Sequence, residues 1–320
     1  MANTLIQVEH LSRNYGSLQA VDRVNFELSQ GEVLGFLGPN GAGKSTTMQM
    51  ITGNLAPSQG SVKICGIDLL EQPKLAKAEI GYLPEQPPLY RELTVDEYLT
   101  FAARINRIAK NKISAALDSA KQRCGLEQVG KRLINNLSKG YQQRVGIAQA
   151  IIHSPSIVVL DEPTVGLDPI QIREIRDLIR ELGKEHGVIL STHILPEVQM
   201  TCDHVQIINR GQLVFADKIE NLNQRMQASS LIMGLQHSPT AEAITTIEHV
   251  DAADDLGDDR WRIHFQPESS PAEALAKQAV ENNWGLYELT PEHKSLEQIF
   301  VDITTAEQIQ PEQTQEEQIA

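Results

Sequence analysis

Apolar runs alternate with helical stretches over about the first 215 residues of the chain. Val33–Leu37 and Ile157–Leu160 are apolar throughout, which is typical of strands buried on both faces of a sheet. Val24–Leu28 instead alternates apolar and polar residues, as a strand with one solvated face does. Helical periodicity separates such strands, for example over Pro169–Leu182. This order predicts a largely parallel sheet with helices on both faces.

The same patterns predict further elements. Strands are expected at Ser61–Cys65, Gly81–Leu83, Val188–Ser191, Val205–Ile208 and Gln212–Phe215. Helices are expected at Thr94–Lys110, Ile113–Arg123 and Gln142–His153. Thr94 and Glu97 form the sequence pattern of a capping box at the start of the first helix. Residues 84–140 are therefore predicted to be a helical insertion within an α/β domain that covers residues 1–216.

From about Asp217 the composition shifts toward Gln, Glu, Ala and Asp. Residues 217–305 are predicted to form a small α+β domain of βαβαβ type. Its strands are expected at Leu231–Leu235, Trp261–Phe265 and Gly285–Leu289, and its helices at Ala241–Ile247, Ala272–Asn282 and Leu296–Ile303. Residues 306–320 are rich in Gln and Glu, lack an apolar period, and are predicted to be disordered.

A glycine-rich loop follows the apolar strand Val33–Leu37 and precedes a helical stretch at Ser45–Ile51. Its sequence, GPNGAGKS, fits GxxxxGK followed by Ser or Thr in the strand-to-helix context of a phosphate-binding loop. Glycines let the backbone wrap an anion, and the N–H groups at a helix start face that anion. Lys44 is expected to contact the β- and γ-phosphates, and the Ser45 hydroxyl to bind Mg²⁺. The residues predicted to contact the nucleotide here are Gly38, Pro39, Asn40, Gly41, Ala42, Gly43, Lys44, Ser45 and Thr46.

Two adjacent acids, Asp161 and Glu162, end the apolar strand Ile157–Leu160. A buried strand delivers its terminal side chains to the carboxyl edge of the sheet, where ligands bind in open α/β folds. Asp161 is predicted to orient Mg²⁺, and Glu162 to hold the attacking water as general base. Two acids at a strand end could also mark a solvated corner, and the phosphate loop upstream favours the catalytic interpretation.

Composition limits the partners of the chain. A formal net charge of −14 and an aromatic content of 4% disfavour nucleic acid as a main partner. The three cysteines form no CxxC pair, which favours reduced thiols in a reducing compartment. No apolar run is long enough to span a membrane, and the first residues do not resemble a signal peptide. We expect a cytoplasmic chain that only another protein would hold at a membrane.

Further segments, in order along the chain, resemble the ATP-binding cassette (ABC) ATPases over about Ile6–Phe215. LSKGY, which begins at Leu137, is similar to the family's signature loop, and Gly166–Asp168 to its D-loop. Gln86, in GYLPEQPPLY, matches the family's glutamine loop, and His193 its switch histidine. The resemblance implies an α/β P-loop NTPase core of the ABC ATPase type with a helical subdomain, followed by the small α+β domain.

The resemblance also implies roles for single residues. Tyr15 would stack on adenine, Gln86 would sense Mg²⁺ and the γ-phosphate, and His193 would steady the transferring group. ABC cassettes close head to tail, so Ser138, Gly140 and Asp168 would contribute to a nucleotide site shared with a second cassette. That cassette is expected to be an identical chain, although the sequence leaves a related chain open. The implied ligands are ATP and Mg²⁺.

LSKGY and the segment WGLYELTPEHKSLEQIF resemble cassettes that serve type-2 exporters, including multidrug and gliding-motility systems. The implied partner is a membrane permease on a separate chain, whose coupling helix would dock on Pro87–Glu97. The implied location is the cytoplasmic face of the membrane, reached through that permease.

Three alternative functions fit the sequence less well. A soluble ABC ATPase of translation or repair would carry two cassettes or a long coiled-coil insertion, and the chain has neither pattern. A GTPase would need NKxD, whereas residues 111–114 read NKIS. A non-enzymatic binding module is disfavoured because Lys44, Asp161, Glu162 and His193 are all present.

Overall fold

The buried strands predicted from sequence form the middle of a six-stranded sheet ordered β10-β9-β3-β8-β7-β6. In this computed structural model, β3 (Val33–Leu37), β7 (Ile157–Asp161) and β8 (Gly187–Thr192) are buried at every position. They run parallel to one another and to β6 and β9, while β10 is antiparallel to β9. The remaining strands are β6 (Ile80–Leu83), β9 (His204–Asn209) and β10 (Gln212–Lys218). The predicted parallel sheet is therefore confirmed.

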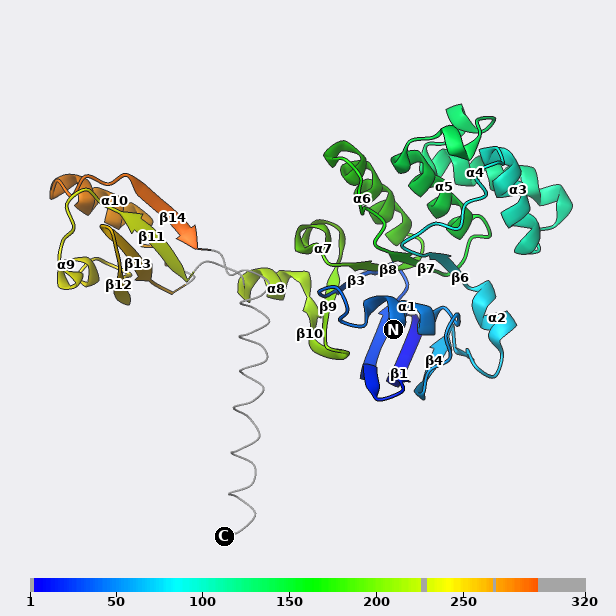
Figure 1. The fold of residues 1–320 in the computed structure, drawn as a ribbon, viewed down its shortest axis with the longest axis horizontal. Coiled ribbons are helices and arrows are strands. Elements are labelled where there is room, and N and C mark those ends of the chain that lie inside the picture. Colours follow the sequence, from blue (N-terminus) through cyan, green and yellow to red (C-terminus); the bar gives the residue numbers. More distant parts are fainter. Residues whose placement is uncertain (1–2, 226–228, 267–268, 293–320) are drawn as a thin grey trace, which may run out of the picture. The chain divides into compact units, whose positions relative to one another are not determined.

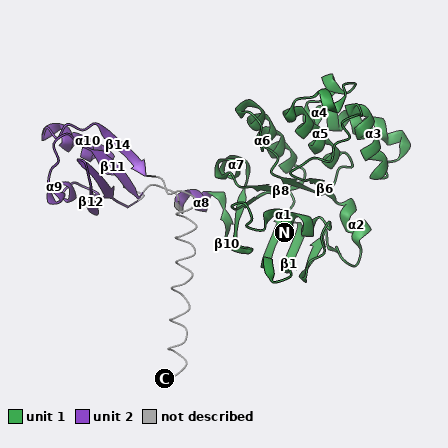
Figure 2. Cartoon of the chain, in the orientation of Figure 1, with its two compact units in different colours: residues 1–219 green, residues 220–320 purple. Residues whose placement is uncertain are grey.

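The structure describes residues 3–225, 229–266 and 269–292, and it divides the chain into two compact units, residues 1–219 and 220–320 (Figure 1, Figure 2). Among the described residues, no helix has both the length and the apolar character that crossing a bilayer requires.

A second sheet of the first unit is antiparallel and has the order β2-β1-β4-β5. Its strands are β1 (Thr4–Tyr15), β2 (Leu18–Ser29), β4 (Gln59–Ile64) and β5 (Ile67–Asp68). Helix α1 (Lys44–Ile51) shares one apolar core with this sheet and with β3, and Phe26 of β2 meets Phe36 of β3 with ring centroids 6.0 Å apart. Packing on two sheets holds the start of α1, and with it the glycine-rich loop, in place.

Three helices pack on one another beyond β6 (Figure 1), namely α3 (Val95–Ile105), α4 (Ile113–Cys124) and α5 (Lys139–Ile151). The capping box is confirmed, since the Thr94 hydroxyl accepts from the Glu97 N–H and the Glu97 carboxylate accepts from the Thr94 N–H. Helix α3 ends at Ile105 rather than Lys110, and Arg107 there has a φ of 58°. Helix α5 begins three residues earlier than predicted because Ser138 caps its N-terminus.

Two helices, α6 (Pro169–Gly183) and α7 (Leu195–Thr201), cover the face of the six-stranded sheet opposite α1 (Figure 1). Helix α6 was predicted and α7 was not. A further short helix that was not predicted, α2 (Pro73–Ala78), packs near β4, β5 and β6.

Helix α8 (Ile219–Arg225) starts at the last residue of the first unit, and the second unit contains an antiparallel sheet of order β12-β13-β11-β14. Its elements are β11 (Ser230–Gly234), α9 (Ala241–Thr245), β12 (Ala252–Gly257), β13 (Arg260–His264), α10 (Ala272–Glu281) and β14 (Glu288–Glu292). The prediction of a βαβαβ order was wrong, because the chain follows βαββαβ, the split βαβ arrangement.

The missing strand, β12, is an acidic and mostly exposed edge strand, so it carries no apolar signal. The core of this unit, formed by residues such as Leu231, Trp261 and Leu275, was visible in the sequence. The predicted helix Leu296–Ile303 and the tail 306–320 lie outside the described residues.

His186, at the turn before β8, is buried, and it generates a testable pH dependence. Its Nδ1 lies 2.7 Å from the Pro155 carbonyl oxygen, and burial lowers its pKa from the ordinary 6.5. The unfolded chain therefore binds a proton more readily than the folded chain. The contribution of His186 to the free energy of unfolding is complete above the ordinary pKa of 6.5 and decreases as the pH falls below it. We compare thermal unfolding at pH 7.5 and 5.5, and we expect acidification to lower the melting temperature of His186→Asn less than that of the wild type. The exposed His10→Asn should behave like the wild type, and an equal loss in all three proteins would contradict the prediction.

Candidate active site

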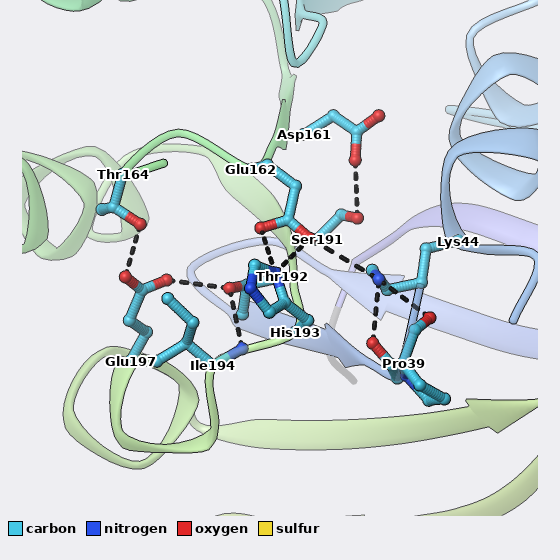
Figure 3. A network of polar contacts seen from close by, with 11 residues as sticks. Pro39, Lys44, Asp161, Glu162, Thr164, Ser191, Thr192, His193, Ile194 and Glu197 are labelled. Atoms are coloured by element: carbon cyan, nitrogen blue, oxygen red, sulfur yellow. Dashed lines mark hydrogen bonds and ion pairs between the residues drawn. The ribbon is translucent and has the colours of Figure 1, made fainter. Parts of the chain in front are cut away.

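The glycine-rich loop joins β3 to α1, and its lysine folds back over it. Lys44 Nζ donates to the carbonyl oxygens of Gly38 at 2.8 Å and Pro39 at 3.2 Å (Figure 3). Gly43 has a φ of 109°, which side chains rarely adopt, and a Cβ there would lie 2.6 Å from the Ala20 carbonyl oxygen. The loop therefore needs glycine at this position for both reasons, and its wound backbone presents a helix N-terminus to an anion.

Asp161 ends β7 and is almost fully buried. Ser191 Oγ donates to its Oδ1 at 2.7 Å. Burial raises the pKa of Asp161, and the hydroxyls of Ser191 and Ser45 act in the opposite direction. A buried carboxylate that has neutral hydroxyl partners favours an added cation, and hydroxyl and carboxylate oxygens are hard ligands. Ser45 and Asp161 therefore form a donor set that fits Mg²⁺.

Glu162 lies between two nitrogen groups. Its carboxylate is 3.5 Å from Lys44 Nζ, and both of its oxygens are 3.0 Å from His193 Nδ1 (Figure 3). Glu162 is 6% exposed, whereas the His193 side chain is 40% exposed. The backbone of Glu162 has a φ of 49°, and its N–H donates to the Ser191 carbonyl oxygen at 2.8 Å. Strand β8 thus holds the carboxylate toward the loop.

One open pocket of about 430 Å³ is lined by Lys44, Glu162 and His193 together with other residues of the loop. The lining consists of Ala20, Asn40, Gly41, Gly43, Lys44, Ser45, Thr46, Glu85, Glu162, Val165 and His193. The predicted phosphate loop, general base and switch histidine thus meet at the carboxyl ends of β3, β7 and β8, at the edge where ligands bind in such sheets. A phosphate on the loop would have the Glu162 carboxylate within reach as acceptor for a water.

Gln86 and its neighbour Glu85 differ in their position relative to the pocket. Gln86 is exposed and does not line the pocket, whereas its neighbour Glu85 does. The negative charge of Glu85 also contributes to raising the pKa of Asp161. The role predicted for Gln86 stays a prediction.

Other predicted residues lie outside the pocket lining of their own chain. Tyr15 ends β1 and is half exposed, with the Arg13 guanidinium 4.8 Å from its ring centroid. Ser138 caps α5, accepting from the Tyr141 N–H at 3.4 Å. Asp168 caps α6, accepting from two backbone N–H groups at 2.9 and 3.0 Å.

The signature loop and the D-loop meet within one chain. The side chain of Lys139 covers Gly166, where a Cβ would lie 2.1 Å from Lys139 Nζ. Gly140, beside Lys139, is buried against the Gln171 side chain of α6.

A polar network behind Glu162 and His193 was missed by the sequence analysis. Glu197 of α7, which is 1% exposed, accepts from the hydroxyls of Thr164 and Thr192 (Figure 3). Its sequence signal is slight, since an acid in the first turn of a short helix usually serves the helix dipole.

Comparison with known proteins gives consistent matches. A family model described as ABC transporter matches residues 21–165. The bacitracin transport ATP-binding protein BcrA of Bacillus licheniformis is 36% identical over 304 residues, which cover 94% of this chain and 97% of that protein. A structure of the ATP binding subunit of an ABC transporter matches with a TM-score of 0.63 and 32% identity, covering 69% of this chain and 92% of that chain. CbiO1 from Clostridium perfringens, part of the ABC transporter complex cbiONQ, matches with a TM-score of 0.64 and 30% identity, covering 69% of this chain and 91% of that chain.

Two glycines of the loop provide a matched test of its shape. Gly41 and Gly43 both have positive φ, but a Cβ on Gly41 would meet nothing within 4 Å, whereas one on Gly43 would meet backbone. Gly41→Ala should lower the stability of the loop only by the strain of a left-handed backbone, about 1–2 kcal/mol. Gly43→Ala should also distort the loop and weaken ATP binding by about tenfold or more, a change of at least 1.4 kcal/mol. Isothermal titration with ATP measures this, and equal affinities in the two variants would contradict the expected close packing.

Proposed function

The chain belongs to the ATP-binding subunits of ABC transporters, and on that premise we propose that its pocket binds ATP with Mg²⁺. As a member of this family it is an ATPase that powers a separate permease. The observation that carries the assignment of the pocket is the position of Glu162, between Lys44 and His193 at the mouth of the phosphate loop.

The phosphates would lie on the loop and the start of α1. Lys44 Nζ now contacts two loop carbonyls and the Glu162 carboxylate, and it would exchange some of these contacts for β- and γ-phosphate oxygens. Ser45 and Asp161 would hold Mg²⁺, which when bound neutralises charge on the phosphate oxygens. Glu85 would bring a further carboxylate to this part of the pocket.

Hydrolysis needs a water aligned with the γ-phosphorus. We propose that Glu162 accepts a proton of that water while its oxygen bonds to phosphorus. The bond from the γ-phosphorus to the bridging oxygen breaks, and its electron pair leaves on the β-phosphate of ADP. His193 borders the same carboxylate and would donate to the transferring phosphoryl group.

A second cassette would complete the site. Ser138, Gly140 and Asp168 lie outside the pocket lining of their own chain, at the starts of α5 and α6. Helix N-termini bind anions, so these starts suit the γ-phosphate of a facing cassette. We propose a homodimer closed head to tail over two ATP molecules.

The permease would dock on the surface of α3. A small groove of about 190 Å³ is lined by Pro88, Tyr90, Tyr98, Phe101, Ala102, Ile105, Asn106 and Gln149. Tyr90 meets Tyr98 and Phe101 edge to face, with ring centroids 6.0 and 5.4 Å apart. Tyr90, Phe101 and Ile105 are exposed, and such an apolar patch suits a helix of a partner. The proposed surface therefore extends from Pro87–Glu97 onto α3.

A type-2 exporter is the finer proposal for the permease, and docking would hold the cassette at the cytoplasmic face of the membrane. The proposal is supported by LSKGY and by the similarity to a bacitracin transport subunit over 94% of this chain, which includes most of the second unit.

Glu162→Gln tests the proposed general base. The amide keeps the shape of the side chain but does not accept a proton, so we expect ATP turnover to fall by about 100-fold or more. ATP binding should stay within about twofold of wild type, because the phosphate loop is unchanged. Phosphate release and equilibrium titration with ATP measure the two quantities. Glu71→Gln, at an exposed site, is the control, and wild-type turnover by Glu162→Gln would refute the role.

The groove is tested by Phe101→Ala together with Ile105→Ala. Each truncation removes apolar contact worth about 1.5–3 kcal/mol when fully buried, so the affinity for the permease should fall by about tenfold or more. Turnover by the isolated cassette should not change, since neither residue lines the ATP pocket. Co-purification from detergent-solubilised membranes and transport assays measure the effect. Leu70→Ala, which truncates an exposed leucine outside the groove, should co-purify normally, and so would the double variant if the permease docked elsewhere.

A further inference from the structure

Glu197 is a buried carboxylate that the proposed reaction does not use. It lies in the first turn of α7, is 1% exposed, and does not line the ATP pocket. A carboxylate removed from water is costly unless hydrogen bonds compensate for its lost hydration. Both oxygens have such a bond, since Oε1 accepts from Thr164 Oγ1 and Oε2 accepts from Thr192 Oγ1 at 2.9 Å.

The two threonines belong to two different catalytic loops. Thr164 follows the proposed base Glu162 by two residues in the loop after β7. Thr192 ends β8 and directly precedes His193. Thr192 Oγ1 also accepts from the Ile194 N–H at 3.1 Å, so it fixes the backbone on both sides of His193. One carboxylate therefore ties together the segments that carry Glu162 and His193 (Figure 3).

We propose that Glu197 is a positioning residue that sets the contact between Glu162 and His193. This role rests on the proposed catalytic roles of Glu162 and His193. Glu162 needs such support because its φ of 49° costs about 1–2 kcal/mol for a residue with a Cβ. Its carbonyl oxygen accepts from the Val165 N–H at 3.3 Å, and the Thr164 carbonyl oxygen accepts from the Leu167 N–H at 3.2 Å. A hydroxyl bond at Thr164 thus stabilises the turn that aims the base.

A separate hydrogen bond, to the carbonyl oxygen of Thr164, reaches the D-loop. The Leu167 N–H that Thr164 holds lies in Gly166–Asp168, the segment proposed to face the second cassette. Through Thr164 and Thr192, Glu197 is therefore connected to three features: the base, the switch histidine and the start of the D-loop. A small displacement of such groups lowers the rate far more than it lowers substrate affinity.

The test removes, one at a time, the two threonine hydroxyls that bind Glu197, in the full-length chain. Thr164→Val and Thr192→Val keep the size of the side chain, and we expect each to lower kcat by about tenfold or more with the Kd for ATP within about twofold. Because both hydroxyls act through one carboxylate, the double variant should lose little beyond the more impaired single variant. Thr201→Val is the matched control, since Thr201 lies on the same helix and its buried Oγ1 has no hydrogen-bond partner among the described residues.

Serine variants separate the hydrogen bond from packing. Thr164→Ser and Thr192→Ser keep the hydroxyl and lose a methyl group, so they should retain kcat near wild type. They also keep the proposal testable if a valine variant does not fold. Serine variants as impaired as the valine variants would overturn the proposed role of Glu197. Unchanged kcat in the valine variants, or losses that multiply in the double variant, would overturn it as well. Absence of hydrolysis by the wild type in the same assay would instead count against the proposed function of the pocket.

Discussion

The register of three parallel strands is the constraint on which the site depends. β3 pairs with β8, and β8 with β7, so that Leu37 lies opposite Thr192 and Asp161 opposite Ser191. All three strands end at the same edge, where Asp161 is the last residue of β7 and the phosphate loop, Glu162 and His193 follow the three strands directly. A slip of one residue would turn the terminal side chains to the other face of the sheet. The contact of Glu162 with both Lys44 and His193 exists only in this register.

The site concentrates buried charge and backbone strain. Lys44, Asp161, Glu162 and Glu197 are all nearly inaccessible, and Glu162 has a left-handed backbone. Each buried charge lies against an opposite charge, a hydroxyl or a carbonyl, which limits the cost of its lost hydration. The apolar strands around them provide the surrounding stability. ATP and Mg²⁺ would bring charges of both signs. Their binding is therefore expected to exchange partners among these buried charged groups.

Helices α3, α4 and α5 bring the proposed permease surface and the signature loop into one packed group. The Arg144 guanidinium of α5 reaches the Cys124 carbonyl oxygen of α4 and forms an ion pair with Glu174 of α6. On the other side, the side chain of Lys139 lies over Gly166 of the D-loop. Side chains of α5 therefore contact both the helical group and the α6 side of the sheet. This arrangement suits a cassette in which a permease and a nucleotide influence each other.

The sequence by itself determined the features that depend on neighbouring residues. Unbroken apolar runs predicted β3 and β7, a glycine pattern predicted the phosphate loop, and Thr94 with Glu97 predicted the cap of α3. Only the tertiary structure decided that Glu85 rather than Gln86 lines the pocket, that β12 pairs as an acidic edge strand, and that Glu197 holds two distant loops. These features depend on strand register and on side chains brought together from far apart in the chain. Local periodicity contains no information about such contacts.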